Sequence, residues 1–293
     1  MTSLFTSSNP SIPFRTLAKP VSLRGIGLHT GVEVAVELCP SDTCGLVFVR
    51  ADLDGEPEIP AALSSVTTTT HATTLAKNGC TLSTTEHLLA ALWITGITHC
   101  RIRIHGPEIP ILDGSAGGWI ELLHTAGSHE LSGARPVYTL REPVWIEAQG
   151  ASVLGLPHDA FRLSVAVSYD RPFLSPQSCD FDVTPEVFAT EIAPARTFTL
   201  EEWLQPLRSA GLIRGGSTDN AIVLSENGPS SPYHFTDELA RHKALDVLGD
   251  FALMFAPDGG LLHAHIVAIR AGHGPHRAWM ERCLETDALY SRR

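Results

Sequence analysis

The stretch ARPVYTLREPVWIEAQG, residues 134–150, restarts a β-strand pattern after a helical segment and so decides how the chain is organised. FRLSVAVSY, residues 161–169, continues that pattern with apolar and polar residues in alternation, which is typical of a half-buried strand. Helical patterns return at Pro185–Ile192 and Leu200–Ala210. The second half of the chain is therefore expected to form a sheet followed by helices.

The first half has the same order of elements. VEVAVEL (32–38) and LVFVRA (46–51) alternate with a period of two and predict strands. A helix is predicted from Ser83 to Ile97, a further strand at RIRIHG (101–106), and a second helix from Gly117 to Ala126. Strands followed by helices, twice over, indicate two α+β units.

We therefore expect an α+β fold of two similar sheet-plus-helix sandwich domains, spanning residues 14–133 and 134–293. Residues 1–13 are rich in Ser, Pro and Thr and are expected to be flexible. The two halves share this order of strands and helices, but they show no convincing sequence repeat. GIGLHTG (25–31) lacks the glycine spacing and the following helix of a dinucleotide-binding loop, and instead predicts a tight turn with His29 at its tip.

Composition narrows the class of protein. Hydrophobic residues make up 43% and charged residues 18% of the chain, as in globular proteins. A net charge of -11 argues against non-specific nucleic-acid binding. The six cysteines form no CxxC pair and are expected to be free thiols. No segment has the pattern of a membrane span or a signal peptide, so we expect a cytoplasmic protein. We also expect a monomer.

The helix predicted from Thr236 to Phe255 carries a polar stripe. His242, Asp246 and Asp250 recur every four residues and share one face, surrounded by apolar positions. Buried carboxylates need a metal or a paired cation, which makes His242 and Asp246 candidate metal ligands. The alternative is a solvated stripe whose carboxylates pair with Lys243 and neighbouring arginines.

A second helix can supply a third ligand. In STTEHLLAALW (83–93), His87 lies in the first helical turn beside Glu86. Two histidines and one aspartate match the three protein ligands of a catalytic zinc site, and Glu86 would then act on the attacking water. On spacing alone, a capping box between Ser83 and Glu86 is favoured over this reading.

Two further segments carry candidate residues. His273 in AGHGPH (271–276) follows an apolar strand, and an imidazolium paired with Asp250 can stabilise an oxyanion and protonate a leaving amine. His276 competes for that role. Thr197 offers a hydroxyl to a carbonyl, and Phe198 a ring that can stack on a sugar. No G-x-S-x-G motif indicates a covalent nucleophile.

Together these segments resemble one known family, the UDP-3-O-acyl-N-acetylglucosamine deacetylases (LpxC) of lipid A biosynthesis. The resemblance runs from about residue 16 to residue 276. The matching segments are GIGLHTG, STTEHLLAAL, GPEIPILDGSAGGWIELL, ARTF, GGSTDNAIV, RHKALDVLGD and AGH.

The resemblance implies a zinc-dependent hydrolase that removes acetate from a UDP-linked, 3-O-acylated amino sugar. The metal ligands would be His87, His242 and Asp246. The family further implies the following roles: Glu86 is the general base, His273 the electrostatic stabiliser and acid, Asp250 the carboxylate that orients His273, Thr197 the oxyanion-side hydroxyl, Phe198 the sugar-packing ring and Lys243 the cation near the substrate's phosphates.

The family fold consists of two α+β sandwiches with the active site between them, and Ile26 and Leu28 would contribute to an apolar passage for the acyl chain. This chain departs from the family after Gly272-His273, where it reads GPHRAW instead of an alanine and an asparagine pair. Thr218 replaces a common aromatic residue. A metal-binding protein without turnover and an amidase for another acylated amino sugar remain alternatives, as does iron(II) in place of zinc.

Overall fold

The computed structural model describes residues 11–148 and 150–292. Its first large sheet has the order β10-β1-β9-β3-β2, with β4 paired to β9 and β5 to β4. The strands are β1 (Pro13–Leu17), β2 (Val21–Ile26), β3 (Glu33–Pro40), β4 (Gly45–Arg50), β5 (Glu58–Pro60), β9 (His99–His105) and β10 (Ser128–Ala134). In β3, Val34, Val36 and Leu38 are buried, as the period-two pattern predicts.

The second large sheet has the order β12-β13-β19-β11-β20, with β14 paired to β19 and β15 to β14. Its strands are β11 (Val137–Leu140), β12 (Val144–Ala148), β13 (Ala151–Pro157), β14 (Phe161–Val167), β15 (Gln177–Asp182), β19 (Leu261–Ile269) and β20 (Leu289–Arg292). The long strand β19 runs antiparallel to β13 and parallel to both β14 and β11. Strand β19 is therefore the central strand of this sheet.

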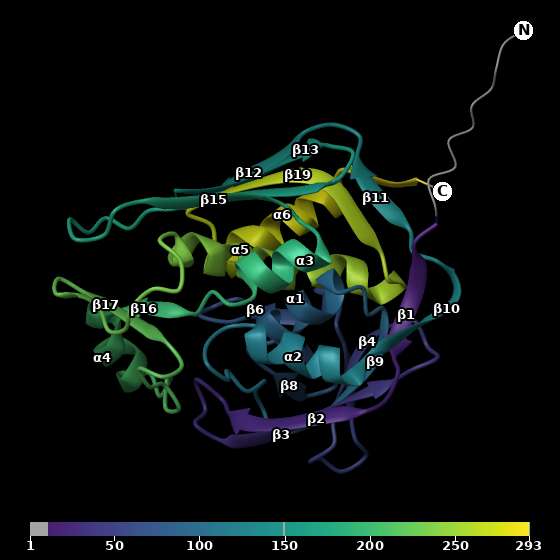
Figure 1. The fold of residues 1–293 in the computed structure, drawn as a ribbon, viewed down its shortest axis with the longest axis horizontal. Helices are drawn as coiled ribbons and strands as arrows, with labels where there is room; N and C mark the ends of the chain where they lie inside the picture. The colour runs from purple at the N-terminus through teal and green to yellow at the C-terminus, as the bar shows by residue number, and fades with distance from the viewer. Residues whose placement is uncertain (1–10, 149, 293) are drawn as a thin grey trace, which may run out of the picture.

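Helices fill the space between the two sheets (Figure 1). They are α1 (Glu86–Ile94), α2 (Gly117–Ala126), α5 (Glu238–Phe255) and α6 (His273–Glu285). Helices α1 and α2 cover the first sheet, and α5 and α6 cover the second (Figure 1). Where α5 crosses α1, Gly249 leaves so little room that a Cβ atom there would lie 2.1 Å from the carbonyl oxygen of Glu86. A glycine thus permits the close approach of the two helices that carry the candidate ligands.

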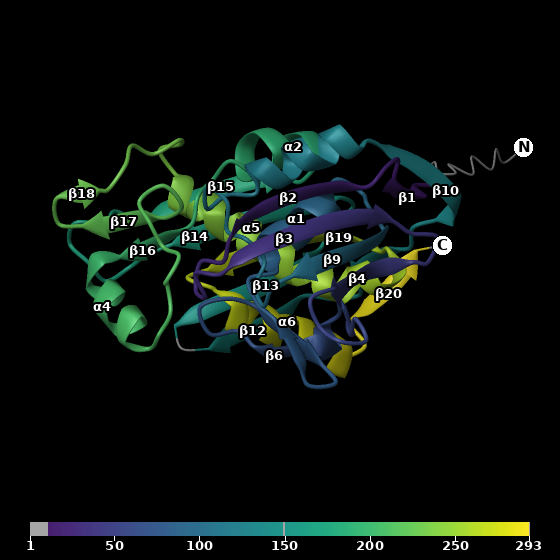
Figure 2. The ribbon, with the colours of Figure 1, turned by 90° about the horizontal axis from the view of Figure 1, so that it is seen from below.

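Smaller elements extend this core. β16 (Phe198–Leu200), β17 (Ile222–Ser225) and β18 (Gly228–Pro229) form a three-stranded sheet beside α4 (Glu201–Ser209). They make a lobe at the end of the molecule opposite the described N-terminal strand (Figure 2). A second small sheet contains β6 (Val66–Thr68), β7 (Thr74–Lys77) and β8 (Cys80–Leu82). The short helical segments are η1 (Leu63–Ser65), α3 (Pro185–Val187), the π-helical η2 (Phe188–Ile192) and η3 (Ala256–Asp258).

The α+β fold class with two helix-covered sheets is confirmed. The division at residues 133 and 134 stays a prediction. Of the segment expected to be flexible, residues 1–10 lie outside the described residues, and Pro13 begins β1. GIGLHTG forms the predicted turn between β2 and β3. No helix within residues 11–148 and 150–292 is long and apolar enough to cross a membrane.

Candidate metal centre and active site

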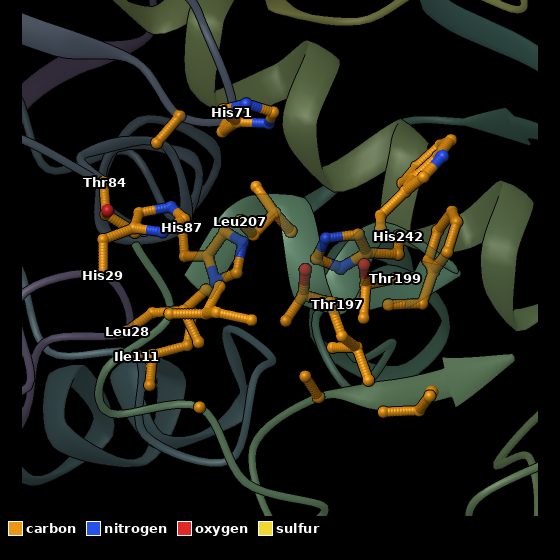
Figure 3. A pocket seen from close by; sticks show the side chains of 18 of the residues that line it. Leu28, His29, His71, Thr84, His87, Ile111, Thr197, Thr199, Leu207 and His242 are labelled. Carbon is orange, nitrogen blue, oxygen red and sulfur yellow. The ribbon is translucent and has the colours of Figure 1, made fainter. Parts of the chain in front are cut away.

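Three potential metal ligands from two helices converge at the α1–α5 crossing. His87 lies on α1, and His242 and Asp246 lie one turn apart on α5. Their ligating atoms all lie within 4.8 Å of one another. Oδ1 of Asp246 is 3.8 Å from Nε2 of His87 and 3.6 Å from Nε2 of His242. Figure 3 shows both imidazole rings in the same pocket.

These side chains fit a zinc ion by their chemistry. Two imidazole nitrogens and one carboxylate oxygen leave a coordination position open, as catalytic zinc sites do. Nδ1 of His242 contacts the carbonyl oxygen of Ala195 at 3.1 Å. That contact assigns the ring hydrogen to Nδ1, so Nε2 carries the lone pair that a metal ion would need. All three ligands are buried, with 5% or less of each residue exposed.

The surroundings of the candidate ligands shift their pKa values so that each has the protonation state that binds metal. Burial, with His242 nearby, lowers the pKa of His87 to about 3. Burial likewise lowers the pKa of His242. Burial opposes ionisation of Asp246, yet Lys243 holds the pKa of that carboxyl below its usual range through an ion pair of 2.7 Å. Neutral imidazoles and an ionised carboxylate are therefore present at neutral pH.

Glu86 is the first residue of α1 and faces the same space. Its Oε2 accepts a hydrogen bond of 3.3 Å from the backbone N–H of Thr73, and its Oε1 lies 3.7 Å from Nε2 of His273. Burial raises the pKa of Glu86 to about 7. A carboxyl group that titrates near neutrality is suited to general acid–base catalysis.

The capping box expected between Ser83 and Glu86 is wrong. Within the described residues, α1 begins at Glu86 after Thr85, and no side chain caps this end. Thr84 adopts a left-handed conformation with φ of 58°, which turns the chain before the helix, and Ser83 instead forms a β-bridge with Glu108. The Glu86 carboxylate is thereby free to face the candidate metal position.

The predicted pairing of His273 with Asp250 is present. Nδ1 of His273 lies 2.8 Å from Oδ2 of Asp250. Burial lowers the pKa of His273, but Asp250 outweighs that effect and raises it to about 10. His273 is therefore an imidazolium at neutral pH, with its Nε2 side facing Glu86. His276, the alternative candidate, contacts the same Asp250 oxygen at 2.7 Å.

The three candidate ligands line a cavity of about 360 Å³. Thr197, Phe198 and Lys243, all predicted from the sequence, line it. So do several apolar residues, among them Leu28, Ile111, Leu204, Leu207 and Ile213. Ile26, which the resemblance placed in an apolar passage, does not line this cavity and is 49% exposed. Thr197 and Lys243 thus share one cavity with the candidate metal ligands and with the apolar side chains that line it.

Sequence reasoning missed Thr73, which contacts two residues of the site, and two arginines in a neighbouring cavity. Thr73 donates its backbone N–H to Glu86 and its hydroxyl to Oδ1 of Asp250, at 3.3 and 2.6 Å. Arg171 and Arg270 line a second cavity of about 270 Å³ that shares Trp203 with the first. Thr73 belongs to the threonine-rich run TTTTHATTL, whose composition gives no signal for one particular threonine.

A family profile described as UDP-3-O-acyl N-acetylglycosamine deacetylase (LpxC) matches residues 14–285. The chain belongs to the LpxC family. A UDP-3-O-acyl-N-acetylglucosamine deacetylase of Thermosynechococcus vestitus is 45% identical over 89% of this LpxC-family chain and 90% of its own length. One of Solibacter usitatus is 40% identical, over 94% of this chain and 92% of its own length.

The profile match covers every candidate site residue and, apart from Pro13 and strand β20, both large sheets. The metal-ligating group, the Glu86–His273 contact and the cavity all lie inside the matched segment. The resemblance inferred from the sequence is therefore confirmed.

Proposed function

We propose that this chain is a zinc-dependent hydrolase that converts UDP-3-O-acyl-N-acetylglucosamine to UDP-3-O-acyl-glucosamine and acetate, in lipid A biosynthesis. The observation that carries this proposal is the convergence of His87, His242 and Asp246 with Glu86 and His273 at one end of a cavity. Membership of the LpxC family supports the same substrate.

The proposed metal ligands are His87, His242 and Asp246. When bound, a zinc ion supplies a Lewis acid that polarises an amide carbonyl and increases the acidity of water. Iron(II) is an alternative occupant of the same donor set, because imidazole and carboxylate ligands suit both metals. Removal of the metal with a chelator and measurement of the metal content distinguish the two.

Glu86 is the proposed general base. Its buried carboxylate takes a proton from the water that attacks the acetamide carbon, and the hydrogen bond from Thr73 fixes its position. As the C–N bond breaks, the leaving amine must gain a proton. His273 is protonated, lies 3.7 Å from Glu86, and is the proposed donor.

The positive charge on His273 also stabilises the oxyanion of the tetrahedral intermediate, and Thr197 is proposed to donate its hydroxyl to the same oxygen. Asp250 orients His273 through the 2.8 Å contact with Nδ1. Glu86, His273 and Asp250 already lie close together in this structure, an arrangement that limits the reorganisation that the reaction requires.

The proposed substrate sites follow the cavity lining. Lys243, whose Nζ lies 5.4 Å from the Phe198 ring centroid, would attract the phosphates, and Phe198 would pack on the sugar. Arg270 in the adjacent cavity would add positive charge for a diphosphate in an otherwise acidic protein, whereas Arg171 beside it is paired with Glu202. The apolar lining of the main cavity would take the acyl chain.

The cytoplasmic location is likewise a proposal. All six cysteines are free, which supports a reducing compartment. The expected monomer stays a prediction, which light scattering on the purified protein checks.

Acetate release from UDP-3-O-acyl-N-acetylglucosamine by the purified zinc-loaded protein tests the function. We expect turnover by the wild type and a loss of at least about 100-fold in Glu86→Gln, with zinc retained. Glu121→Gln, on an exposed position of α2, is the matched control and should keep wild-type rates. A zinc-loaded wild type without turnover would identify a metal-binding protein, and turnover on another acylated amino sugar alone would identify a different amidase.

A further inference from the structure

The carboxylate of Asp250 is held by three donors from two segments of the chain. Thr73 donates its hydroxyl to Oδ1 at 2.6 Å. His273 and His276 both place Nδ1 against Oδ2, at 2.8 and 2.7 Å. The two histidines are three residues apart on α6, so they project from the same face of the helix.

The side chain of His276 is fully buried, and within the described residues its one hydrogen-bond partner is Asp250. Its exposed fraction is 0%, and its ring meets Phe251 edge-on with centroids 6.3 Å apart. Within the described part of the chain its Nε2 is buried without a hydrogen-bond partner. A hydrogen on Nε2 would be an unsatisfied buried donor, so the ring hydrogen is on Nδ1 and is donated to Asp250.

The two histidines differ in how firmly they are anchored. His273 is the first residue of α6 and is flanked by Gly272 and Gly274. His276 lies in the first full turn, where its backbone N–H bonds the carbonyl of Gly272 at 3.1 Å, and its side chain is enclosed in the core. Asp250 therefore receives one donor from the first residue of α6 and one from inside its first turn, where the side chain is fully enclosed.

We propose that His276 is a positioning residue for the reaction: its Nδ1–H fixes Oδ2 of Asp250 in the place from which that oxygen orients His273. Without this donor, Oδ2 would be held by His273 alone, and the Thr73 hydroxyl on Oδ1 would be left as the anchor of the carboxylate that does not itself depend on His273. The inference rests on the proposed function for its kinetic consequence. The claim that His276 immobilises His273 does not depend on the proposed function.

Two substitutions separate the donor from the volume of the ring. In His276→Asn, the Nδ2 atom is attached to Cγ as Nδ1 is in histidine and can donate to the same oxygen. In His276→Leu, the side chain fills a similar volume and donates nothing. Met280→Ala removes a buried side chain from the same helix without touching Asp250 and is the control for loss of packing.

We expect kcat of zinc-loaded His276→Leu to fall about tenfold with KM within about twofold of wild type, as for other groups that orient a catalytic side chain. His276→Asn should keep kcat within about twofold of wild type, and Met280→Ala should lose thermal stability without this kcat loss. Equal kcat in the Leu and Asn variants, or an effect on KM alone, would overturn the proposal.

A measurement without substrate keeps this test separate from the proposed function. In protein labelled with 15N-histidine, the Nδ1–H signal of His273, assigned with His273→Gln, reports how tightly that ring is held. Its exchange with water should be about tenfold faster in His276→Leu than in His276→Asn. Equal exchange rates would refute the positioning role, whereas a wild type without acetate release would refute the deacetylase function alone.

Discussion

Gly249→Ala adds one methyl group at the point where α5 meets the start of α1. The new Cβ would lie 2.1 Å from the carbonyl oxygen of Glu86, 2.6 Å from its carbonyl carbon and 2.8 Å from its Cα. These are backbone atoms, so no side-chain rotation relieves the clash. Ordinary contacts begin near 3.4 Å, and the two helices must therefore separate by more than about 1 Å.

That separation acts directly on the candidate metal site. His87 moves with α1, whereas His242 and Asp246 move with α5. Metal–ligand distances tolerate deviations of about 0.2 Å, so we expect zinc affinity to fall by about 100-fold or more. Alanine favours a helix over glycine by about 1 kcal/mol, but overpacking costs about 1–3 kcal/mol. The variant should therefore be neutral to moderately destabilised while its affinity for zinc falls.

Zinc affinity is measured by competition with a chromogenic chelator, and the free energy of unfolding by urea titration of the metal-free protein. Gly118→Ala, in α2, is the matched control, because its Cβ would meet only the end of the Leu112 side chain at 2.9 Å. The control should bind zinc as the wild type does. Wild-type zinc affinity in Gly249→Ala would refute the claim that the helix crossing assembles the site.

Three further outcomes are expected. Chelation should abolish acetate release and stoichiometric zinc should restore it, as measured by coupled acetate detection. Asp250→Asn should lower kcat by about 10- to 100-fold with zinc content unchanged, since Asp250 acts on His273 and does not ligate the metal. In the metal-free protein, the raised pKa of His273 stabilises the fold fully below pH 6.5, and this stabilisation is lost as the pH rises towards the folded-state pKa of about 10. Urea titrations at pH 6 and pH 10 should therefore show a smaller pH-dependent loss in His273→Gln than in the wild type.

The sequence predicts best those elements whose residue pattern repeats along a single segment of the chain. The strand pattern of residues 32–38 and the four-residue spacing of His242 and Asp246 depend on neighbours along one chain segment. The helix Gly117–Ala126 has the bounds that the sequence predicts. These features need no knowledge of the tertiary fold.

The remaining features depend on contacts between distant segments. The approach of His87 to Asp246 requires Gly249 against Glu86, a packing contact between two helices. The spacing of Ser83 and Glu86 predicted a capping box. It does not form, because Thr84 between them is left-handed and the Glu86 side chain is buried, so tertiary packing outweighs the local preference. Sequence likewise treats His273 and His276 as alternatives, whereas the structure places both on one oxygen of Asp250.

The most direct test of the central claim is anomalous diffraction at the zinc absorption edge from crystals of the zinc-loaded protein. We predict a strong peak within bonding distance of Nε2 of His87, Nε2 of His242 and a carboxylate oxygen of Asp246. A peak at the other buried group that could hold a metal, Asp250 with His273 and His276, and none among the three proposed ligands would contradict the account.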